Sequence, residues 1–425
     1  MQVLELSKPD RSLRGEITLE GSKSISNRAL IVLALAGADP AEWLERLSAS
    51  KDTATLQRLL TQTDSDVYDA GDAGTTFRFM TARLCLQAGT QTLTGSARML
   101  ERPIGALVTA LRSLGADIEY LGQEGYPPLR IGPPAQLGAA SRKVHINGGT
   151  SSQFLSALLM IGPCLPNGLE LIPEGELVSR PYLEMTLRLM RYFGATANWQ
   201  GDRIVVEPGA YSPRKFVVEA DWSAASYWYA LAALADAPDV RLNGLFADSW
   251  QGDAVLSDMM QSFGIQTDFD ATGIHLKPSG RPVKPVFEWN FLECPDIAQT
   301  LAVVCAGLGI QGIFSGLETL SIKETDRIAA IRNELAKVGV SFSKLPPHFN
   351  KKSPDQTFFL VDGKAHWQDT PQFATYGDHR MAMAFAPLAL LAPVRIEDPL
   401  VVRKSYGSFW EHLGSAGFLE VRGER

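Results

Sequence analysis

The chain has 425 residues, of which 45% are hydrophobic and 20% are charged, and its formal net charge is −7. This length suits two or three domains that each bury a sizeable core, and the composition is ordinary for a globular protein. The negative balance argues against general nucleic-acid binding, which requires a basic face.

The first residues scatter charged side chains through the segment 1–14, so no signal-peptide apolar core is expected there. The longest apolar run, Met381 to Val394, is too short to span a bilayer and contains two prolines. Cysteines and histidines show no metal-type spacing, so no metal site is predicted. We expect a cytoplasmic protein with reduced core thiols at Cys85, Cys164, Cys294 and Cys305.

In chain order, six polar or charged clusters each open a helix-length run rich in alanine and other small apolar residues. After the first gap they recur at roughly 70 to 80 residues, which indicates an internal repeat. Because a helix N-terminus carries unpaired N–H groups and partial positive charge, each opening is a potential anion site. Capping preference alone would also explain each one. The openings are Lys23-Ser24-Ile25-Ser26-Asn27-Arg28, Asp72-Ala73-Gly74-Thr75, Thr150-Ser151-Ser152-Gln153, Asp221-Trp222-Ser223, Pro295-Asp296 and Asp378-His379-Arg380.

A second series runs in phase, in which an amphipathic helix ends at a glycine before a strand-like stretch. Glycine just past a helix is the expected left-handed cap. These glycines are Gly115, Gly194, Gly264, Gly339 and Gly417. The first copy, near Leu59, lacks the glycine, so the sequence shows five good copies and one weak copy.

Short apolar or alternating segments such as Leu169–Ile172 and Ile204–Glu207 have the character of strands. The alanine-rich helices are apolar nearly all round and should be buried, whereas the glycine-ended helices should lie outside. We therefore predict an α/β (α+β) fold of βαβαββ-like copies, three in each of two domains. The domains are expected at 21–219 and at 1–20 plus 220–425, with crossings near residues 20 and 220.

Cations accompany several openings, and each has an ordinary explanation. Lys323 and Arg327 would share one face if their segment is helical, yet such a cluster is most often a solvated, salt-bridged first turn. Asp296 could be only a cap, and His379 is more often a core or capping histidine than a catalyst.

Nine segments change this interpretation because they match one family in order, spacing and type. The segments are GSKSISNRAL from Gly21, AGTT from Ala73, ERPIG from Glu101, SSQF from Ser151, SRPY from Ser179, PDIA from Pro295, KETDR from Lys323, DHRMAM from Asp378 and RKSY from Arg403. With them the chain resembles the 5-enolpyruvylshikimate-3-phosphate synthases (EPSP synthases) of the enolpyruvyl transferase family. The resemblance implies transfer of the enolpyruvyl group of phosphoenolpyruvate to the 5-hydroxyl of shikimate 3-phosphate, with release of phosphate. It also implies helix N-termini that face an interdomain cleft.

The resemblance implies a set of ligand contacts, residue by residue. Shikimate 3-phosphate would contact Lys23, Ser24, Arg28, Ser151, Ser152, Gln153, Ser179, Tyr182, Asp296 and Lys323. Phosphoenolpyruvate would contact Lys23, Gly74, Arg102, Gln153, Arg327, Arg380 and Lys404. No cofactor, nucleic acid or membrane partner is expected, and the family suggests a monomer.

With Glu324 of the KETDR segment added to this set, the site holds seven cations against two acids, Asp296 and Glu324, for two ligands that together carry roughly five to six negative charges. We assign Asp296 as the base at the 5-hydroxyl and Glu324 as the acid that protonates the methylene carbon. Lys23 would assist the departing phosphate. Nearby cations favour the carboxylate, so desolvation would have to raise the pKa of Glu324.

Three positions depart from the familiar family form, which has asparagine at Asp72, proline at Phe79 and asparagine at Thr319. An added carboxylate at Asp72 would need a partner such as Arg78. Gly74 should leave room for the inhibitor glyphosate. The alternatives are UDP-N-acetylglucosamine enolpyruvyl transferase, whose usual cysteine is missing between Thr94 and Arg102, and a non-catalytic anion-binding relative.

Overall fold

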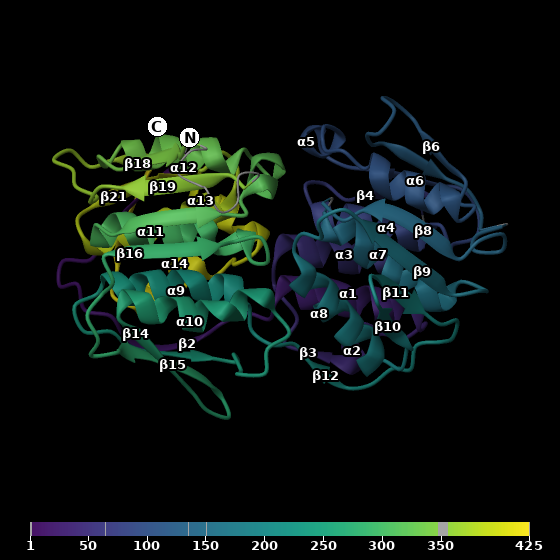
Figure 1. The fold of residues 1–425 in the computed structure, drawn as a ribbon, viewed down its shortest axis with the longest axis horizontal. Coiled ribbons are helices and arrows are strands. Elements are labelled where there is room, and N and C mark those ends of the chain that lie inside the picture. The colour runs from purple at the N-terminus through teal and green to yellow at the C-terminus, as the bar shows by residue number, and fades with distance from the viewer. Residues whose placement is uncertain (1, 64, 135, 150, 347–355, 425) are drawn as a thin grey trace. The chain divides into compact units, whose positions relative to one another are not determined.

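The computed structural model describes residues 2–63, 65–134, 136–149, 151–346 and 356–424. The chain divides into two compact units, one formed by Gly21–Glu219 and the other by Met1–Glu20 together with Ala220–Arg425. Below they are called the inner-segment unit and the terminal unit. In Figure 1 the inner-segment unit runs from purple to teal, and the terminal unit carries the green and yellow elements.

One sheet topology recurs five times in the described part of the chain. In the sheet with strand order β4-β5-β7-β6, β4 pairs with β5 in parallel, whereas β5 with β7 and β7 with β6 are antiparallel pairs. The four strands are β4 (Val67–Asp69), β5 (Gln91–Thr94), β7 (Leu129–Ile131) and β6 (Ile118–Tyr120). A helix follows each of the first two strands, so the copy reads βαβαββ, as the sequence predicts.

The same order is found in four more sheets. They are β8 (Lys143–Asn147), β9 (Leu169–Glu174), β11 (Arg203–Val206), β10 (Ala197–Gln200); β2 (Arg14–Thr18), β13 (Asp239–Asn243), β15 (Gly273–Pro278), β14 (Ile265–Phe269); β16 (Val286–Asn290), β17 (Gln311–Ser315), β19 (Phe358–Asp362), β18 (Ser341–Lys344); and β20 (Gln372–Phe373), β21 (Val394–Glu397), β1 (Gln2–Ser7), β22 (Leu419–Glu424).

The remaining copy, the first along the chain by its helices α1 (Lys23–Leu35) and α3 (Lys51–Thr61), is the weak one. Among the described residues it has only the parallel pair of β12 (Phe216–Val217) with β3 (Leu44–Glu45), and those that follow its second helix add no strand pair of their own. Two copies in the terminal unit are completed by the N-terminal segment, because β2 pairs with β13 and β1 lies between β21 and β22. The first twenty residues are therefore structural parts of the terminal unit.

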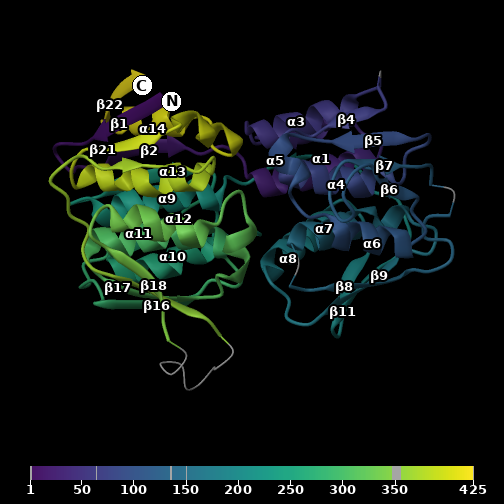
Figure 2. The same cartoon turned by 90° about the horizontal axis from the view of Figure 1, so that it is seen from above.

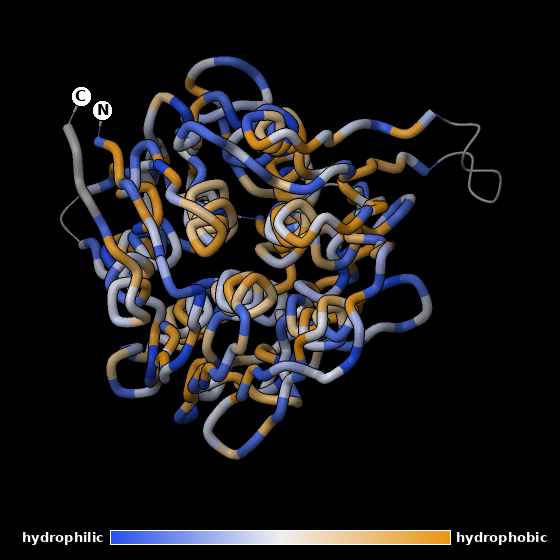
Figure 3. Tube along the Cα trace, turned by 90° about the vertical axis from the view of Figure 1, so that its left-hand side faces the viewer, coloured by the Kyte–Doolittle hydropathy of each residue, from blue (hydrophilic) through white to orange (hydrophobic). Residues whose placement is uncertain are grey.

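The alanine-rich helices are buried, as expected, and pack on one another in threes. In the inner-segment unit α1, α4 and α7 are in mutual contact, and in the terminal unit α9, α11 and α13 are. Figure 2 shows the latter three side by side, and Figure 3 shows apolar residues concentrated on the central helices. The helices are α1 (Lys23–Leu35), α4 (Gly74–Leu84), α7 (Ser152–Ile161), α9 (Trp222–Leu234), α11 (Ala298–Leu308) and α13 (His379–Phe385).

The second helix of each copy is amphipathic and covers the outside. Five of these end at the predicted glycine, and Gly115, Gly194, Gly264, Gly339 and Gly417 all have φ between 76° and 96°. Because only glycine takes this conformation without strain, each helix stops there and the chain turns into a strand. The outer helices are α3 (Lys51–Thr61), α6 (Gly105–Ser113), α8 (Arg180–Tyr192), α10 (Leu256–Met259) with η3 (Met260–Phe263), α12 (Arg327–Ala336) and α14 (Phe409–Ser415). Two shorter helices, α2 (Pro40–Trp43) and α5 (Ala97–Leu100), lie in the connecting loops.

The six helix openings differ in how they are capped. Ser151, Asp221 and Asp378 accept a hydrogen bond from a backbone N–H of their own helix. The starts of α1, α4 and α11 have no side-chain cap. Thr150, the first residue of the third opening, lies outside the described residues. Capping therefore accounts for only half of these clusters.

One sequence expectation about the core is wrong. Cys85, Cys294 and Cys305 are buried and free, but Cys164 is exposed. Its apolar run ends in the short turn η1 (Gly162–Cys164), which carries the side chain out of the core. No helix of the described residues has both the length and the apolarity that crossing a membrane requires.

Candidate active site

In the inner-segment unit, Lys23 is the first residue of α1 and its ammonium group forms an ion pair with Asp52. Lys23 Nζ lies 3.3 Å from Asp52 Oδ2, and both side chains are mostly buried. The backbone oxygen of Asp52 accepts a hydrogen bond from Thr76 Oγ1 at 3.0 Å. Asp52 thus joins the start of α1 to the first turn of α4.

Arg28 is a buried cation with no carboxylate partner among the described residues. Its side chain donates to Thr186 Oγ1 at 2.7 Å, to Ser156 Oγ at 3.0 Å and to the backbone oxygen of Ser24 at 2.9 Å. Only 1% of the residue is exposed, and burial lowers the pKa of Arg28 to about 10. The group stays protonated at neutral pH, so its charge is available for an anionic ligand.

Two aromatic rings flank the same guanidinium. Its central carbon lies 5.4 Å from the ring centroid of Phe79 and 5.8 Å from that of Tyr182. Cation–π contacts of this kind stabilise a desolvated guanidinium. Phe79, one of the departures from the family form, therefore packs directly against a predicted ligand-binding residue.

Gly74, the first residue of α4, lies beneath two guanidinium groups. A Cβ atom at Gly74 would lie 2.4 Å from Arg102 Nη1 and 2.7 Å from Arg78 Nη1. Among the described residues Arg102 makes no side-chain hydrogen bond or ion pair, whereas Arg78 donates to the Gly74 oxygen at 2.9 Å. Arg78 also packs over Phe154. The uncapped start of α4 is therefore strongly positive.

Four further predicted residues lie at or near the starts of α7 and α8. Gln153 Nε2 donates to Thr75 Oγ1 at 3.0 Å, which ties the start of α7 to that of α4. Ser151 caps α7 through the N–H of Gln153, and Ser152 is its first residue. Ser179 precedes α8 with φ 55° and ψ 39°, a left-handed conformation that costs a non-glycine residue about 1 kcal/mol.

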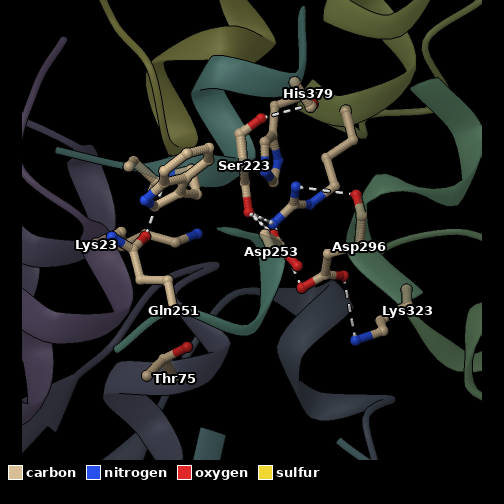
Figure 4. A network of polar contacts seen from close by, with 12 residues as sticks. Lys23, Thr75, Ser223, Gln251, Asp253, Asp296, Lys323 and His379 are labelled. Carbon is tan, nitrogen blue, oxygen red and sulfur yellow. Dashed lines mark hydrogen bonds and ion pairs between the residues drawn. The ribbon is translucent and has the colours of Figure 1, made fainter. Parts of the chain in front are cut away.

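In the terminal unit, Asp296 is surrounded by three cations. Figure 4 shows one of them, Lys323, beside the Asp296 carboxylate. The Oδ1 atom of Asp296 lies 3.0 Å from Arg327 Nη1 and 3.4 Å from Lys323 Nζ, and its Oδ2 lies 3.3 Å from Arg380 Nη2. Burial alone would raise the pKa of Asp296, but Arg380, Lys323 and Arg327 outweigh it and hold the pKa well below the usual range. Asp296 is thus an ionised carboxylate and not a helix cap.

Arg327 is shared by three carboxylates. It donates from Nε to Asp378 Oδ2 at 2.7 Å, from Nη1 to Asp296 and from Nη2 to Glu324 Oε2 at 2.8 Å. Only 1% of its side chain is exposed. Burial would lower the pKa of Arg327, but the three carboxylates raise it. The guanidinium therefore fixes Asp296 and Glu324 in one place.

Lys323 and Arg327 do not share a helix face. Lys323 follows η5 (Glu318–Ile322) in an extended conformation, and α12 begins only at Arg327. Asp326 caps that helix by accepting from the N–H of Ala329. Both cations nevertheless meet at Asp296 because the turn between them brings Lys323 back toward it.

Arg380 and Lys404 complete the predicted set. Arg380 Nη1 donates to the backbone oxygen of Asp296 at 3.1 Å, so its guanidinium holds both ends of that residue. Lys404, at the end of η8 (Pro399–Lys404), donates to the backbone oxygen of Gly377 at 3.0 Å and makes no ion pair among the described residues. Gly377 belongs to the loop that leads into α13.

The sequence count of charges missed three acids, Asp52, Asp253 and Asp378, which contact or face the predicted cations. The positive excess is therefore smaller than the sequence suggested. Asp378 was visible as a helix opening, but Asp52 and Asp253 stand in segments with no motif. Asp52 and Asp253 pair with side chains 29 or more residues away in the sequence, and no local sequence pattern indicates such a distant partner.

The other two departures from the family form, Asp72 and Thr319, also have defined surroundings. Asp72 is exposed and accepts a hydrogen bond from Ser96 Oγ, and no cation of the described residues forms an ion pair with it. The expected pairing with Arg78 is therefore wrong, because that guanidinium packs over Phe154 instead. The hydroxyl of Thr319 is buried and has no hydrogen-bond partner in the described part of the chain.

The residues that the structure describes contain no group of three or more His, Cys, Asp or Glu side chains that could hold a metal ion.

Comparison with known proteins decides the family. The family model described as EPSP synthase (3-phosphoshikimate 1-carboxyvinyltransferase) matches residues 37–413. The chain belongs to the EPSP synthase family. A 3-phosphoshikimate 1-carboxyvinyltransferase from Bacteroides fragilis is 46% identical over 416 residues, covering 97% of both chains, and one from Bordetella petrii is 38% identical, covering 94% of both.

Solved structures of low sequence identity share the fold. EPSP synthase from Acinetobacter baumannii superposes with a TM-score of 0.77 over 100% of both chains at 20% identity. The enolpyruvyl transferase NikO from Streptomyces tendae gives 0.70 at 17% identity, covering 99% of this chain and 98% of NikO. This mixed α/β architecture of small sheets is the EPSP synthase fold.

Membership fixes the reaction class. The chain is a 3-phosphoshikimate 1-carboxyvinyltransferase, a transferase of the shikimate pathway that uses phosphoenolpyruvate and shikimate 3-phosphate. The structure adds a cationic cluster in each of its two units, and each cluster includes residues predicted from the sequence.

Proposed function

We propose that the two residue sets described above bind the two substrates and carry out the transfer. The observation that carries the proposal is the cluster around Asp296, where Lys323, Arg327 and Arg380 surround one carboxylate and Glu324 shares Arg327 with it. A cluster of this kind supplies two carboxylates for proton transfer and three cations for anionic ligands. That the helix starts of both units face one cleft stays a prediction.

Shikimate 3-phosphate binds through Arg28 at its carboxylate. Support comes from the buried guanidinium, which is held by neutral acceptors and aromatic faces and has no carboxylate partner within the described part of the chain. Arginine suits this task because its planar fork bonds both oxygens of a carboxylate. Ser24 and Tyr182 adjoin Arg28, and the hydroxyls of Ser151, Ser152 and Ser179 receive the phosphate.

Phosphoenolpyruvate binds through Gly74, Arg102, Arg327, Arg380 and Lys404, with Lys23 and Gln153 as further contacts. The start of α4, which has no side-chain cap, supports this assignment, as does the side chain of Arg102, which makes no hydrogen bond or ion pair with the residues that the structure describes. Backbone N–H groups at a helix start favour an anion.

Asp296 takes the proton of the attacking 5-hydroxyl. In the free protein its three cations hold the pKa too low for an efficient base. The substrates bring negative charge to the same cations, so binding weakens their hold on Asp296 and raises its pKa. Substrate binding thereby activates the base.

Glu324 donates a proton to the methylene carbon of phosphoenolpyruvate while the 5-hydroxyl oxygen attacks the adjacent carbon. The bond from that carbon to the phosphate oxygen then breaks, phosphate leaves, and Glu324 takes a proton back from the new methyl group. In the free protein Arg327 Nη2 lies 2.8 Å from Glu324 Oε2. The incoming anion competes for this arginine and so releases Glu324 for its role as the acid.

Lys23 stabilises the phosphate as it leaves, from its position at the start of α1. Asp52 holds the ammonium group in place at 3.3 Å. We further propose that the protein works as a monomer in the cytoplasm, in line with its free cysteines.

The substitution Glu324→Gln tests this mechanism. We expect phosphate release from phosphoenolpyruvate and shikimate 3-phosphate to fall at least a hundredfold, because general acid–base catalysis typically contributes about 100- to 10,000-fold. The KM values should change little, since glutamine keeps a hydrogen-bonding oxygen. Glu318→Gln is the matched control, because Glu318 is exposed at the start of η5.

Near-normal turnover of the Glu324→Gln protein would refute the acid role. Failure of the unmodified protein to release phosphate with this acceptor would refute the reaction itself.

A further inference from the structure

The fourth helix opening, to which the sequence assigned no ligand, lies beside Arg380. Ser223, in the first turn of α9, donates its hydroxyl proton to Asp253 Oδ2 and accepts a hydrogen bond from Arg380 Nη2 at 3.4 Å. Figure 4 shows Ser223, Asp253 and Asp296 gathered around one guanidinium. Asp253 comes from η2 (Gly252–Val255), so three separate elements meet here.

The direction of the Ser223 hydrogen bond depends on Asp253. A serine hydroxyl has a single proton, and its remaining lone pairs can only accept. Because the carboxylate takes that proton, the oxygen of Ser223 is left to face the Arg380 guanidinium. Without an acceptor at residue 253, the hydroxyl could rotate and direct its proton toward the arginine.

The segment that carries Asp253 is tied to the start of α9. Gln251 Nε2 donates to the backbone oxygen of Ala220 at 2.7 Å, and Gln251 Oε1 accepts from the N–H of Trp222 at 3.1 Å. These bonds fix the position of Asp253 relative to Ser223. The arrangement of acceptor, hydroxyl and guanidinium is therefore built into the fold of the terminal unit.

Asp253 is buried, so that ionisation of its carboxyl group is energetically unfavourable. Only 3% of the residue is exposed, and its Oδ1 is buried with no hydrogen-bond partner in the described part of the chain. Desolvation, together with the charges of Asp296 and Asp221, raises the pKa of Asp253 to about 6, and the opposing influence of Arg380 and Ser223 is smaller. A buried carboxylate with one unsatisfied oxygen is unfavourable for folding, which is typical of groups retained for function.

We propose that Asp253 is a positioning residue that fixes the Arg380 guanidinium through the Ser223 hydroxyl and thereby increases the affinity for phosphoenolpyruvate. This rests on the proposed contact between Arg380 and that substrate. Asp296 supplies two further anchors of the guanidinium, at its backbone oxygen and at Oδ2. Together with Ser223, they hold the guanidinium from two sides.

The test is a double-mutant cycle on Asp253→Ala and Ser223→Ala, with KM for phosphoenolpyruvate measured at saturating shikimate 3-phosphate. Each single substitution should raise this KM about tenfold, because a positioned bond to a charged group is lost. The kcat and the KM for shikimate 3-phosphate should change less than about threefold. Since Asp253 acts through Ser223, the double variant should match the single variants within about twofold.

Asp258→Ala is the control for loss of a carboxylate from the same segment, because Asp258 is exposed on α10. It should leave the KM unchanged. Ser223→Ala is nearly isosteric and keeps the proposal testable if Asp253→Ala does not fold. An unchanged KM in Ser223→Ala, or effects that multiply in the double variant, would overturn the proposal.

Arg380→Ala separates this inference from the assignment on which it rests. It should raise the KM for phosphoenolpyruvate more than Ser223→Ala does. If it leaves that KM unchanged, the binding role of Arg380 fails and the positioning role fails with it. If Arg380→Ala raises the KM while Ser223→Ala does not, only the positioning role fails.

Discussion

Asp253 carries a carboxylate in a place where ionisation opposes folding. Its pKa is raised from 3.8 to about 6, so the protein is stabilised by this group's proton at low pH and loses that contribution as pH rises through about 6. A shift of about two units corresponds to about 3 kcal/mol at pH 8. Arg380 faces the group as a cation, and Asp296 and Asp221 face it as anions.

The substitution Asp253→Asn removes this ionisation. We expect its midpoint of thermal unfolding, relative to that of the unmodified protein, to rise between pH 4 and pH 8. Below pH 4 the ionisation of Asp253 should contribute little to the difference between the unfolding midpoints of the variant and the unmodified protein. Differential scanning calorimetry across this range measures the effect, and a difference that does not depend on pH would contradict the raised pKa.

Gly74 is a residue whose missing side chain matters. A methyl group there would displace Arg102 Nη1 and Arg78 Nη1, which lie 2.4 and 2.7 Å from the Cβ position. Both are ends of flexible side chains, so the fold should survive and the ligand contact should not. For Gly74→Ala we expect KM for phosphoenolpyruvate to rise about tenfold or more.

Gly105→Ala is the matched control, because Gly105 also begins a helix and its nearest neighbour would be 3.4 Å away. It should bind phosphoenolpyruvate normally. Equal KM values for the two variants would show that Arg102 does not contact this ligand from its present position.

At the scale of the elements, two of the glycines that end the outer helices differ in what a side chain would cost. At both sites the left-handed backbone is unfavourable for other residues, but only at one would a side chain also clash with its neighbours. Gly115 and Gly264 both have left-handed backbones, with φ of 96° and 78°. A Cβ atom at Gly115 would lie 2.7 Å from the backbone oxygen of Gln136, whereas at Gly264 the nearest atom is a valine methyl at 3.4 Å. The first site adds a steric clash to the conformational cost.

We therefore expect Gly264→Ala to destabilise the protein by about 1 kcal/mol, the cost of a left-handed alanine. Gly115→Ala should cost about 2 kcal/mol or more, since a backbone atom must also move. Urea denaturation of the two variants compares the free energies of unfolding. A smaller loss for Gly115→Ala than for Gly264→Ala would contradict the predicted clash.

At the scale of the molecule, the terminal unit is discontinuous in sequence. It needs residues 1–20, because β1 lies between β21 and β22 and β2 pairs with β13. The two chain crossings lie side by side, since Asp221 N donates to Glu20 O at 3.1 Å and Ser22 N donates to Glu219 O at 2.7 Å. Each unit could therefore close on itself.

Three fragments test this organisation. Residues 21–219 alone, and residues 1–20 joined to 220–425 by a short glycine linker, should each unfold cooperatively when followed by circular dichroism. Residues 220–425 alone should not, because β22 loses its partner and the sheet is split. Cooperative unfolding of that last fragment would show that the N-terminal strands are dispensable.

The repeat and its helix boundaries follow from local signals in the sequence. Apolar periodicity, N-terminal polar residues and the glycine stops each act within a few residues, so they are legible without the fold. The same holds for the nine family segments, which carry Asp296, Lys323, Arg327 and Arg380 and thereby identified the principal cluster. Even the weak first copy was visible, because its glycine is missing.

Tertiary packing alone decided which charges meet. Arg327 and Asp378 are 51 residues apart, and Ser223 and Asp253 are 30 apart. The segment from Lys323 to Asp326 is a turn, Cys164 reaches the surface, and Asp72 bonds to Ser96. Hydrogen bonds and ion pairs act over a few ångströms of space irrespective of distance along the chain. The sequence by itself therefore determined the repeated elements and the reaction class, whereas only the packed helices decided how each carboxylate is partnered.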